Sequence, residues 1–182
     1  MNLKQKKYIY NTISSKIIFD EPLKNHTSFG IGGPASCFIY PKNCQELSKL
    51  LQYTKKENIP IFFFGSGSNI LAWDKGFKGI VISLRKTFKK LTIDSNCQII
   101  AETGVMLGNL VKKSIGAQIC GLETLIGVPG TLGGALIMNA GAFGHEISNY
   151  FLEAQTMTLE GELNNPLNFA LQVVYLRILQ LH

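Results

Sequence analysis

Apolar and polar positions in the first half of the chain change between helical and strand-like spacing. Leucines recur on one helical face after Asn43, and Glu46 three residues later completes a capping-box pattern, so we predict a helix over residues 44–57. Short apolar segments on both sides of this helix predict three strands, at residues 36–40, 61–64 and 80–84. The second of them is wholly apolar and aromatic, which predicts a buried strand. Strand, helix, strand, Gly-rich loop and strand in this order form an α/β unit.

The second half shows a different pattern. Residues 91–93 and 97–101 flank an Asp-Ser-Asn sequence, which predicts a hairpin. Apolar residues at helical spacing then predict a helix that is closed by Gly116. These residues are Leu107, Leu110, Val111 and Ile115. Residues 151–159 predict one more strand.

The composition allows a proper core and favours an anionic ligand. Of 182 residues, 46% are hydrophobic and 16% are charged, which suits one domain or two small ones and excludes a disordered tail. The formal charge of +6 favours a polyanion such as a nucleotide. The densest basic cluster, residues 85–90, fits a nucleic-acid surface or a solvated hairpin end, and its single aromatic residue favours the hairpin end. We therefore predict no nucleic-acid partner.

Cysteine usage and the lack of targeting signals predict a soluble, cytoplasmic protein. The cysteines stand far apart without a Cys-x-x-Cys pair, so neither a metal site nor a disulfide framework is expected. They are Cys37, Cys44, Cys97 and Cys120. The N-terminal lysines are not followed by an apolar run long enough for a signal peptide, and no segment reaches the length of a membrane span.

The stretch around which the chain is organised is residues 121–144. It contains no Lys or Arg, and no carboxylate after Glu123, yet it is dense in glycine. Residues 129–134 can present a row of main-chain N–H donors, at a helix start, to a phosphate or pyrophosphate. A set of tight turns between buried strands fits this stretch equally well when it is taken alone.

A second Gly-rich loop, at residues 65–71, follows the predicted strand at 61–64. It begins like a dinucleotide fingerprint but has Ile70 at the place of the third glycine, and it lacks the Gly-Lys-Ser/Thr of a P-loop. A phosphate cradle and a plain turn again fit this loop taken alone. Two uncharged Gly-rich loops, one in each half, together favour a pyrophosphate held between two small lobes.

The sequence offers no catalytic set that the residues alone support. It shows no paired catalytic carboxylates, no metal cluster and no Ser/His/Asp arrangement, so the catalytic residues are unknown. Neighbouring residues on a strand point to opposite faces, and we therefore interpret His145 and Glu146 as structural. We interpret His26, beside Thr and Asn, as a hydrogen-bonded loop residue.

Four motifs in order resemble the UDP-N-acetylenolpyruvoylglucosamine reductases, also called UDP-N-acetylmuramate dehydrogenases. The motifs are TSFGIGGPA at residues 27–35, GSGSNIL at 65–71, GLE and GVPGTLGG within 121–134, and NAGAFG at 139–144. The resemblance implies an α+β fold, with a two-subdomain FAD-binding domain of the vanillyl-alcohol-oxidase (PCMH) type. It also implies that two loops grip the cofactor through Gly65, Ser66, Gly67, Ser68, Asn69, Ile70, Leu71, Pro129, Gly130, Thr131, Gly133, Gly134, Asn139, Gly141 and Ala142.

The resemblance further implies a role in peptidoglycan precursor synthesis. NADPH would be the co-substrate, and a UDP-sugar enolpyruvyl ether would be reduced to UDP-N-acetylmuramate. The negative charge that develops beside the substrate carboxylate must be stabilised and protonated. The expected organisation is an N-terminal lead-in, two FAD-binding subdomains and a divergent or frame-shifted tail, at residues 1–24, 25–84, 85–170 and 171–182.

The C-terminal sequence departs from the family pattern. The family continues with a Phe-x-Tyr-Arg-x-Ser strand and then a substrate domain, whereas here Phe169 and Ala170 are followed by Leu171 and Gln172. We expect a chain that lacks the C-terminal substrate domain and is impaired in catalysis. The alternatives are an FAD-binding fragment without activity and another FAD-dependent oxidoreductase of the superfamily, which would consume oxygen. The sequence predicts no oligomeric state.

Overall fold

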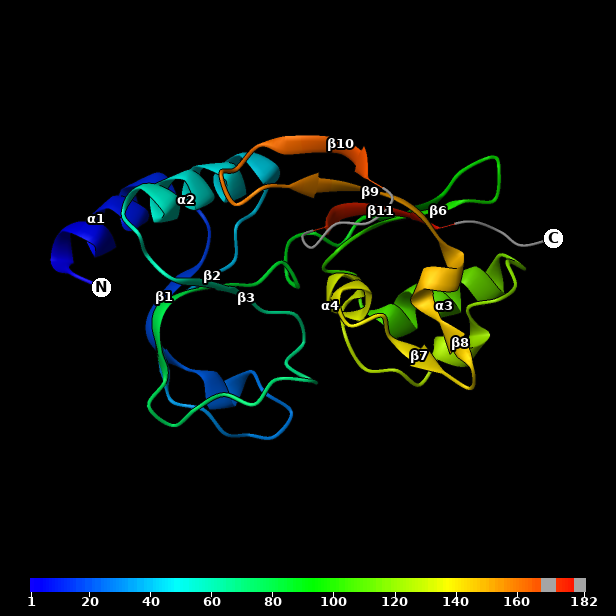
Figure 1. Ribbon diagram of the computed structural model, residues 1–182, viewed down its shortest axis with the longest axis horizontal. Coiled ribbons are helices and arrows are strands. Elements are labelled where there is room, and N and C mark those ends of the chain that lie inside the picture. The colour runs from blue at the N-terminus through cyan, green and yellow to red at the C-terminus, as the bar shows by residue number, and fades with distance from the viewer. Residues whose placement is uncertain (168–172, 179–182) are drawn as a thin grey trace. The chain divides into compact units, whose positions relative to one another are not determined.

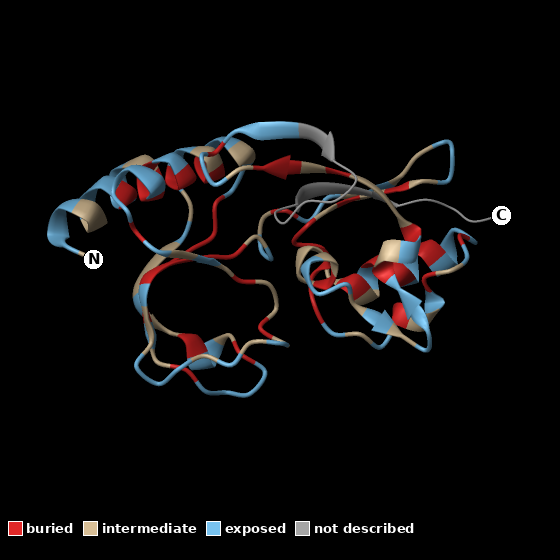
Figure 2. Ribbon diagram, viewed as in Figure 1, coloured by how far each residue is buried: buried red, intermediate tan, exposed pale blue. Residues whose placement is uncertain are grey.

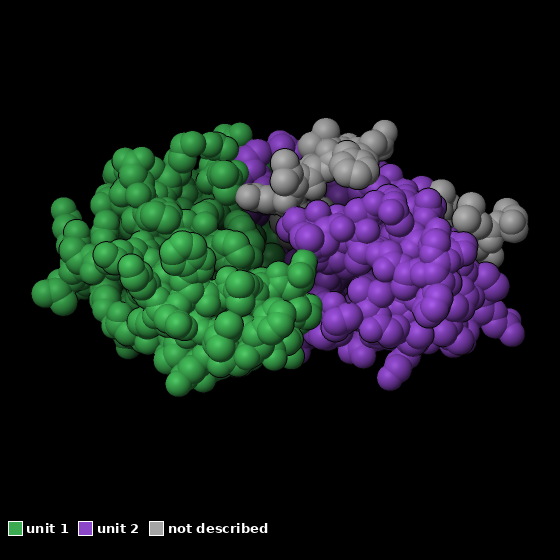
Figure 3. Space-filling view, turned by 60° about the horizontal axis from the view of Figure 1, so that its bottom comes forward, with its two compact units in different colours: residues 1–87, 159–162 green, residues 88–158, 163–182 purple. Residues whose placement is uncertain are grey.

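The computed structural model describes residues 1–167 and 173–178. The chain divides into two compact units, which Figure 3 colours separately. Unit 1 comprises residues 1–87 and 159–162, and unit 2 comprises residues 88–158 and 163–182. The lead-in expected over residues 1–24 lies within unit 1. Among the described residues, no helix is both long enough and apolar enough to cross a membrane.

Unit 1 contains a mixed four-stranded sheet in the order β1-β2-β4-β3 (Figure 1). Its strands are β1 (Ile17–Pro22), β2 (Pro34–Ile39), β3 (Ile61–Phe63) and β4 (Phe77–Ile82). β1 pairs antiparallel with β2, whereas β4 runs parallel to both β2 and β3. α2 (Cys44–Lys56) connects β2 to β3, which lie on opposite sides of β4 and run parallel to it. The predicted α/β unit is therefore confirmed.

The predicted capping box of α2 is only half present. The side chain of Asn43 accepts a hydrogen bond from the N–H of Glu46 at 2.9 Å, as predicted. The carboxylate of Glu46 does not return a bond to Asn43. It accepts instead from the N–H of Lys42 at 3.0 Å and from the N–H and hydroxyl of Ser14 at 2.9 and 2.6 Å. Glu46 thus links α2 to the segment that precedes β1.

The core of unit 1 lies between the sheet and its helices. Figure 2 shows buried positions recurring along α2. The fully buried large side chains include Phe38, Leu47, Leu50, Leu51, Ile80 and Ile82. α1 (Leu3–Thr12) contributes Ile9, which is completely buried, and the short helix η1 (Leu23–Asn25) follows β1.

The prediction of a buried strand at residues 61–64 is wrong. β3 is an edge strand of three residues, and the side chain of Phe62 is 43% exposed. Only Phe64, which follows the strand, is buried, at 4% exposure. An apolar run does not reveal whether its strand lies at the centre or the edge of a sheet. An edge strand has a neighbouring strand on one side only.

Unit 2 contains a five-stranded sheet in the order β10-β9-β11-β6-β5. Its strands are β5 (Leu91–Ile93), β6 (Ile99–Glu102), β9 (Phe151–Met157), β10 (Leu163–Leu167) and β11 (Val173–Ile178). The predicted hairpin is confirmed, because β5 and β6 pair antiparallel. β6 begins two residues later than expected, since Cys97 takes a left-handed φ of 58° and belongs to the turn. The sequence departure at residues 168–172 lies outside the described residues, as do residues 179–182.

Two helices and a small hairpin complete unit 2. They are α3 (Leu107–Gly116), α4 (Leu132–Ile137), and the pair β7 (Gly141–Ala142) and β8 (His145–Glu146), with short helices η2 (Glu123–Leu125) and η3 (Ile147–Tyr150). α3 confirms the predicted helix, but Ile115 is 48% exposed and does not share its buried face. The left-handed residue after this helix is Gln118, with φ of 59°, and not Gly116.

Candidate functional site

Unit 1 brings its two Gly-rich motifs into contact. The carbonyl of Gly67 accepts a hydrogen bond from the N–H of Ser28 at 3.0 Å. Further along, the N–H of Gly33 donates to the carbonyl of Trp73 at 2.8 Å. The motif at residues 27–35 therefore lies along the loop at residues 65–71 and the turn after it, and supports both through main-chain bonds.

Glycine is required at the contact between these motifs. Gly67 has φ of +75°, a left-handed conformation that side chains rarely adopt. A Cβ atom at Gly67 would lie 2.0 Å from the carbonyl oxygen of His26, and one at Gly33 would lie 2.0 Å from that of Asp74. Both obstacles are main-chain atoms, which do not move aside as a flexible side chain would. The glycines therefore set how closely the two segments pack.

The loop at residues 65–71 offers main-chain donors and hydroxyls without any charge. Within the described part of the protein, the N–H groups of Gly65, Ser66, Gly67, Asn69 and Ile70 donate no hydrogen bond. The hydroxyls of Ser66 and Ser68 lie 3.1 Å apart. Successive free N–H groups around a left-handed residue form an anion-binding concavity. The loop therefore fits a phosphate or pyrophosphate group, and this arrangement favours the cradle over the plain turn.

The Gly-rich stretch of unit 2 is arranged differently. α4 begins after Thr131, as the sequence indicated, but its first N–H groups are already used. The N–H of Leu132 donates to the carbonyl of Val105 at 2.8 Å, and that of Gly133 donates to the carbonyl of Thr103 at 2.9 Å. The expected row of donors at this helix start is therefore wrong for these two residues. Among the described residues, the N–H groups of Gly130 and Thr131 donate no hydrogen bond.

The side chain of Thr103 is a feature of this region that sequence reasoning missed. Its hydroxyl oxygen is buried and has no hydrogen-bond partner within the described residues. A Cβ atom at Gly133 would lie 3.0 Å from the Cβ of Thr103, so the two segments pack closely. A buried polar atom without a partner costs free energy, which is a common signal of a site that a ligand completes. Thr103 directly follows β6 in the structure, but the predicted strand ended at residue 101, so the sequence carried no signal for this position.

Three further predicted site residues of unit 2, Asn139, Gly141 and Ala142, lie at the β7–β8 hairpin. The amide of Asn139 donates to a carboxylate oxygen of Glu146 at 2.6 Å, so both side chains hold the hairpin. A ring nitrogen of His145 lies 2.7 Å from the hydroxyl of Tyr150. Gly141 and Ala142 form β7 itself. These contacts agree with the interpretation of His145 and Glu146 as structural.

His26 has the local role that the sequence indicated. Its Nε2 atom lies 2.7 Å from a carboxylate oxygen of Glu21. Its ring stacks on Phe38 with 4.3 Å between the ring centroids. His26 therefore anchors the loop whose carbonyl oxygen faces Gly67.

Comparisons with known proteins find a family of FAD-binding domains and similar reductases. The profile of the family described as FAD binding domain matches residues 35–165. The UDP-N-acetylenolpyruvoylglucosamine reductase of Syntrophomonas wolfei is 41% identical over 150 residues, which are 82% of this chain and 50% of that protein. The enzyme of the same name from Prochlorococcus marinus is 45% identical over 141 residues, 77% of this chain and 48% of that protein. The chain spans about half the length of the curated relatives it matches.

Solved structures show the same architecture. The UDP-N-acetylenolpyruvylglucosamine reductase of Thermus caldophilus is 26% identical with a TM-score of 0.68, and the match covers 91% of this chain and 61% of that one. The 6-hydroxy-D-nicotine oxidase of Arthrobacter nicotinovorans has a TM-score of 0.69 at 17% identity, covering 91% of this chain and 42% of that one. At such low identity the second similarity indicates the fold alone.

Proposed function

The chain belongs to the family of FAD-binding domains, and from this premise we propose that it holds FAD for the reduction of UDP-N-acetylglucosamine enolpyruvate to UDP-N-acetylmuramate. The observation that carries the proposal is the loop at residues 65–71, with its free main-chain N–H groups and its two serine hydroxyls. This loop lies in a chain that is 41% identical, over 82% of its own residues, to the UDP-N-acetylenolpyruvoylglucosamine reductase of Syntrophomonas wolfei.

The residues of unit 1 fit the pyrophosphate of FAD. The main-chain donors of the 65–71 loop can each bond a phosphate oxygen, and no carboxylate stands between Phe64 and Asp74 to repel it. Gly67 allows this curvature, because its φ of +75° turns the chain so that neighbouring N–H groups converge. FAD, when bound, supplies hydride transfer between NADPH and the enolpyruvyl group.

We propose that the predicted residues of unit 2 also contact FAD, through their backbone and through small side chains. Gly130 and Thr131 offer N–H groups, Gly133 and Gly134 leave room for close approach, and Thr103 adds a buried hydroxyl. NADPH and a UDP-sugar are the proposed substrates, and the cytoplasm is the proposed compartment. The two substrates are proposed from the resemblance to the reductase family, and the compartment is proposed from the cysteine usage and the lack of targeting signals in the sequence.

A second candidate function is FAD binding without reduction. The chain spans about half the length of these relatives, and no side chain among the described residues is assigned as the preorganised group that protonates the substrate. Losing one such preorganised group typically lowers the rate by about a hundredfold or more.

Anaerobic spectroscopy of the FAD-loaded chain distinguishes the two candidates. Under the reductase proposal, NADPH bleaches the flavin absorbance, and the enolpyruvyl UDP-sugar then restores it with formation of UDP-N-acetylmuramate. If the bound flavin is not reoxidised by this substrate, the chain is a cofactor-binding protein without reductase activity. Reoxidation by air serves as the control that the reduced flavin remains intact.

A further inference from the structure

A groove between α1 and α2 in unit 1 is not part of the proposed cofactor site. It has a volume of about 660 Å³, and none of the predicted cofactor residues lines it. Its size is within the range of small-molecule sites, which is about 300–1,000 Å³. The two helices that form it also carry many of the basic residues of the chain.

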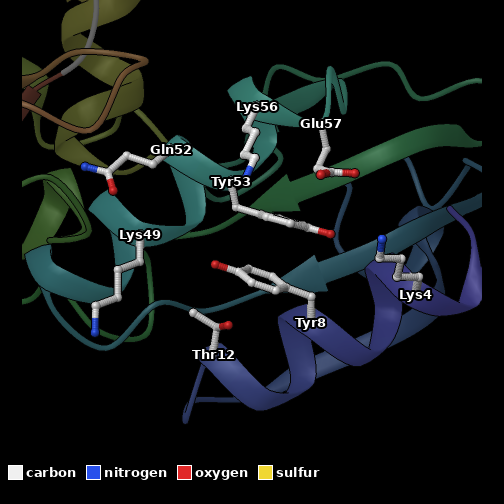
Figure 4. Close-up of a pocket in the computed structure, with 8 residues that line it drawn as sticks. All are labelled: Lys4, Tyr8, Thr12, Lys49, Gln52, Tyr53, Lys56 and Glu57. Atoms are coloured by element: carbon white, nitrogen blue, oxygen red, sulfur yellow. The ribbon is translucent and has the colours of Figure 1, made fainter.

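Two tyrosines form the wall of the groove. The rings of Tyr8 from α1 and Tyr53 from α2 are stacked, with 3.8 Å between centroids and 15° between planes. Tyr53 is 8% exposed, and its burial, together with the nearby charge of Glu57, raises the pKa of its phenol. Figure 4 shows the two phenol oxygens at opposite ends of the stacked pair. Each end of the groove therefore has a phenol hydroxyl that can donate a hydrogen bond.

The groove carries an excess of positive charge. Three lysines line it, Lys4, Lys49 and Lys56, against a single carboxylate from Glu57. In Figure 4, Lys49 lies at the end of the pair that carries the Tyr8 hydroxyl. Lys4 and Glu57 lie at the end that carries the Tyr53 hydroxyl. The ion pairs that α1 and α2 form in the described structure use other lysines, so none of these three ammonium groups has a carboxylate within 4.0 Å there. Like charges that share a concave site repel one another, and an anion relieves that repulsion.

We propose that this groove binds a small molecule through an oligophosphate group. Three spaced ammonium groups and two phenol hydroxyls match a chain of phosphates better than they match a single carboxylate, because each phosphate brings its own charge and acceptor oxygens. The ligand lies across the tyrosine wall, with its phosphates toward Lys49 and Lys56. This site is independent of the FAD site, since it uses different residues.

Isothermal titration calorimetry with inorganic tripolyphosphate tests the proposal on the FAD-loaded chain. We expect one binding event per chain, weakened at least tenfold by the double substitution K49A/K56A. The matched control is K16A/K42A, which removes the same charge at exposed positions of unit 1 outside the groove. The control is expected to change the affinity less than twofold. Binding is also expected to weaken as the salt concentration rises, because salt screens exposed charges.

Two outcomes would overturn the proposal. One is the absence of binding to the unsubstituted chain at low salt. The other is an equal loss of affinity in K16A/K42A and K49A/K56A, which would indicate general attraction by the net charge. If the chain fails to take up FAD, the same titration is run without the cofactor, and the two double variants still separate this groove from the 65–71 loop. Failure of the FAD proposal is thereby distinguishable from failure of this one.

Discussion

At Gly67 the backbone conformation and the packing of the loop both require glycine. The residue has φ of +75°, and a Cβ atom would lie 2.0 Å from the carbonyl oxygen of His26. The left-handed conformation costs alanine about 1 kcal/mol before any clash is counted. The main chain at this position would have to shift, and the shift would move the free N–H groups of Ser66 and Asn69.

We therefore expect G67A to weaken FAD binding by at least about tenfold, which corresponds to about 1.4 kcal/mol. Fluorescence titration of FAD measures the effect. The matched control is G116A at the end of α3, because a Cβ atom there meets no atom within 4 Å. Equal FAD affinities in G67A and the unsubstituted chain, with the fold of both verified by circular dichroism, would show that this loop does not set the cofactor affinity.

Among the elements, α2 depends on one buried carboxylate at its first turn. Glu46 is 7% exposed. Burial opposes its ionisation, but hydrogen bonds from the main chain of Lys42 and from Ser14 and Ser15 outweigh burial and lower the pKa to about 2. The ionised side chain thereby joins the start of α2 to Ser14 and Ser15, which follow the end of α1.

This lowered pKa makes the stability of unit 1 depend on pH. The folded-state pKa of Glu46 is below its ordinary value of 4.5, so the contribution of the ionised form is fully present above that pH. It is lost as the pH falls from 4.5 toward about 2, where the folded protein also takes up the proton. We expect E46Q to lower the free energy of unfolding at pH 7 by about 2 kcal/mol, because hydrogen bonds to a charged group are replaced by weaker ones.

Urea unfolding at pH 7 and pH 3 measures this effect. The difference in unfolding free energy between E46Q and the unsubstituted chain is expected to shrink at the lower pH. E57Q removes an exposed carboxylate from the end of the same helix and controls for the loss of one charge. A difference that stays constant between the two pH values would mean that the Glu46 contacts do not depend on its ionisation.

In the whole molecule, local sequence patterns predicted the positions of helices and strands better than they predicted which side chains are buried or in contact. Residue spacing predicted α2, α3 and the β5–β6 hairpin, because each of them is determined by residues that lie close together in the sequence. The exposure of Phe62 and Ile115 did not follow, because it depends on which neighbours cover each element. The bond between Glu46 and Ser14 was missed for the same reason, as it joins residues far apart in the sequence.

The candidate site shows the same division between local and long-range information. Glycine content alone left the 65–71 loop open between a cradle and a turn. The contact of Gly67 with residues 26–28 and the free N–H groups of the loop favour the cradle, and both are properties of the folded backbone. The engagement of Leu132 and Gly133 by the segment at residues 103–105 was equally invisible in the sequence.

The visible absorption spectrum of the purified chain, recorded with and without added FAD and after removal of the excess, tests whether the chain holds the cofactor. We predict the blue and near-ultraviolet bands of a bound oxidised flavin at one FAD per chain. A folded, colourless chain that retains no FAD would contradict it, and the family membership would then describe ancestry without a working cofactor site.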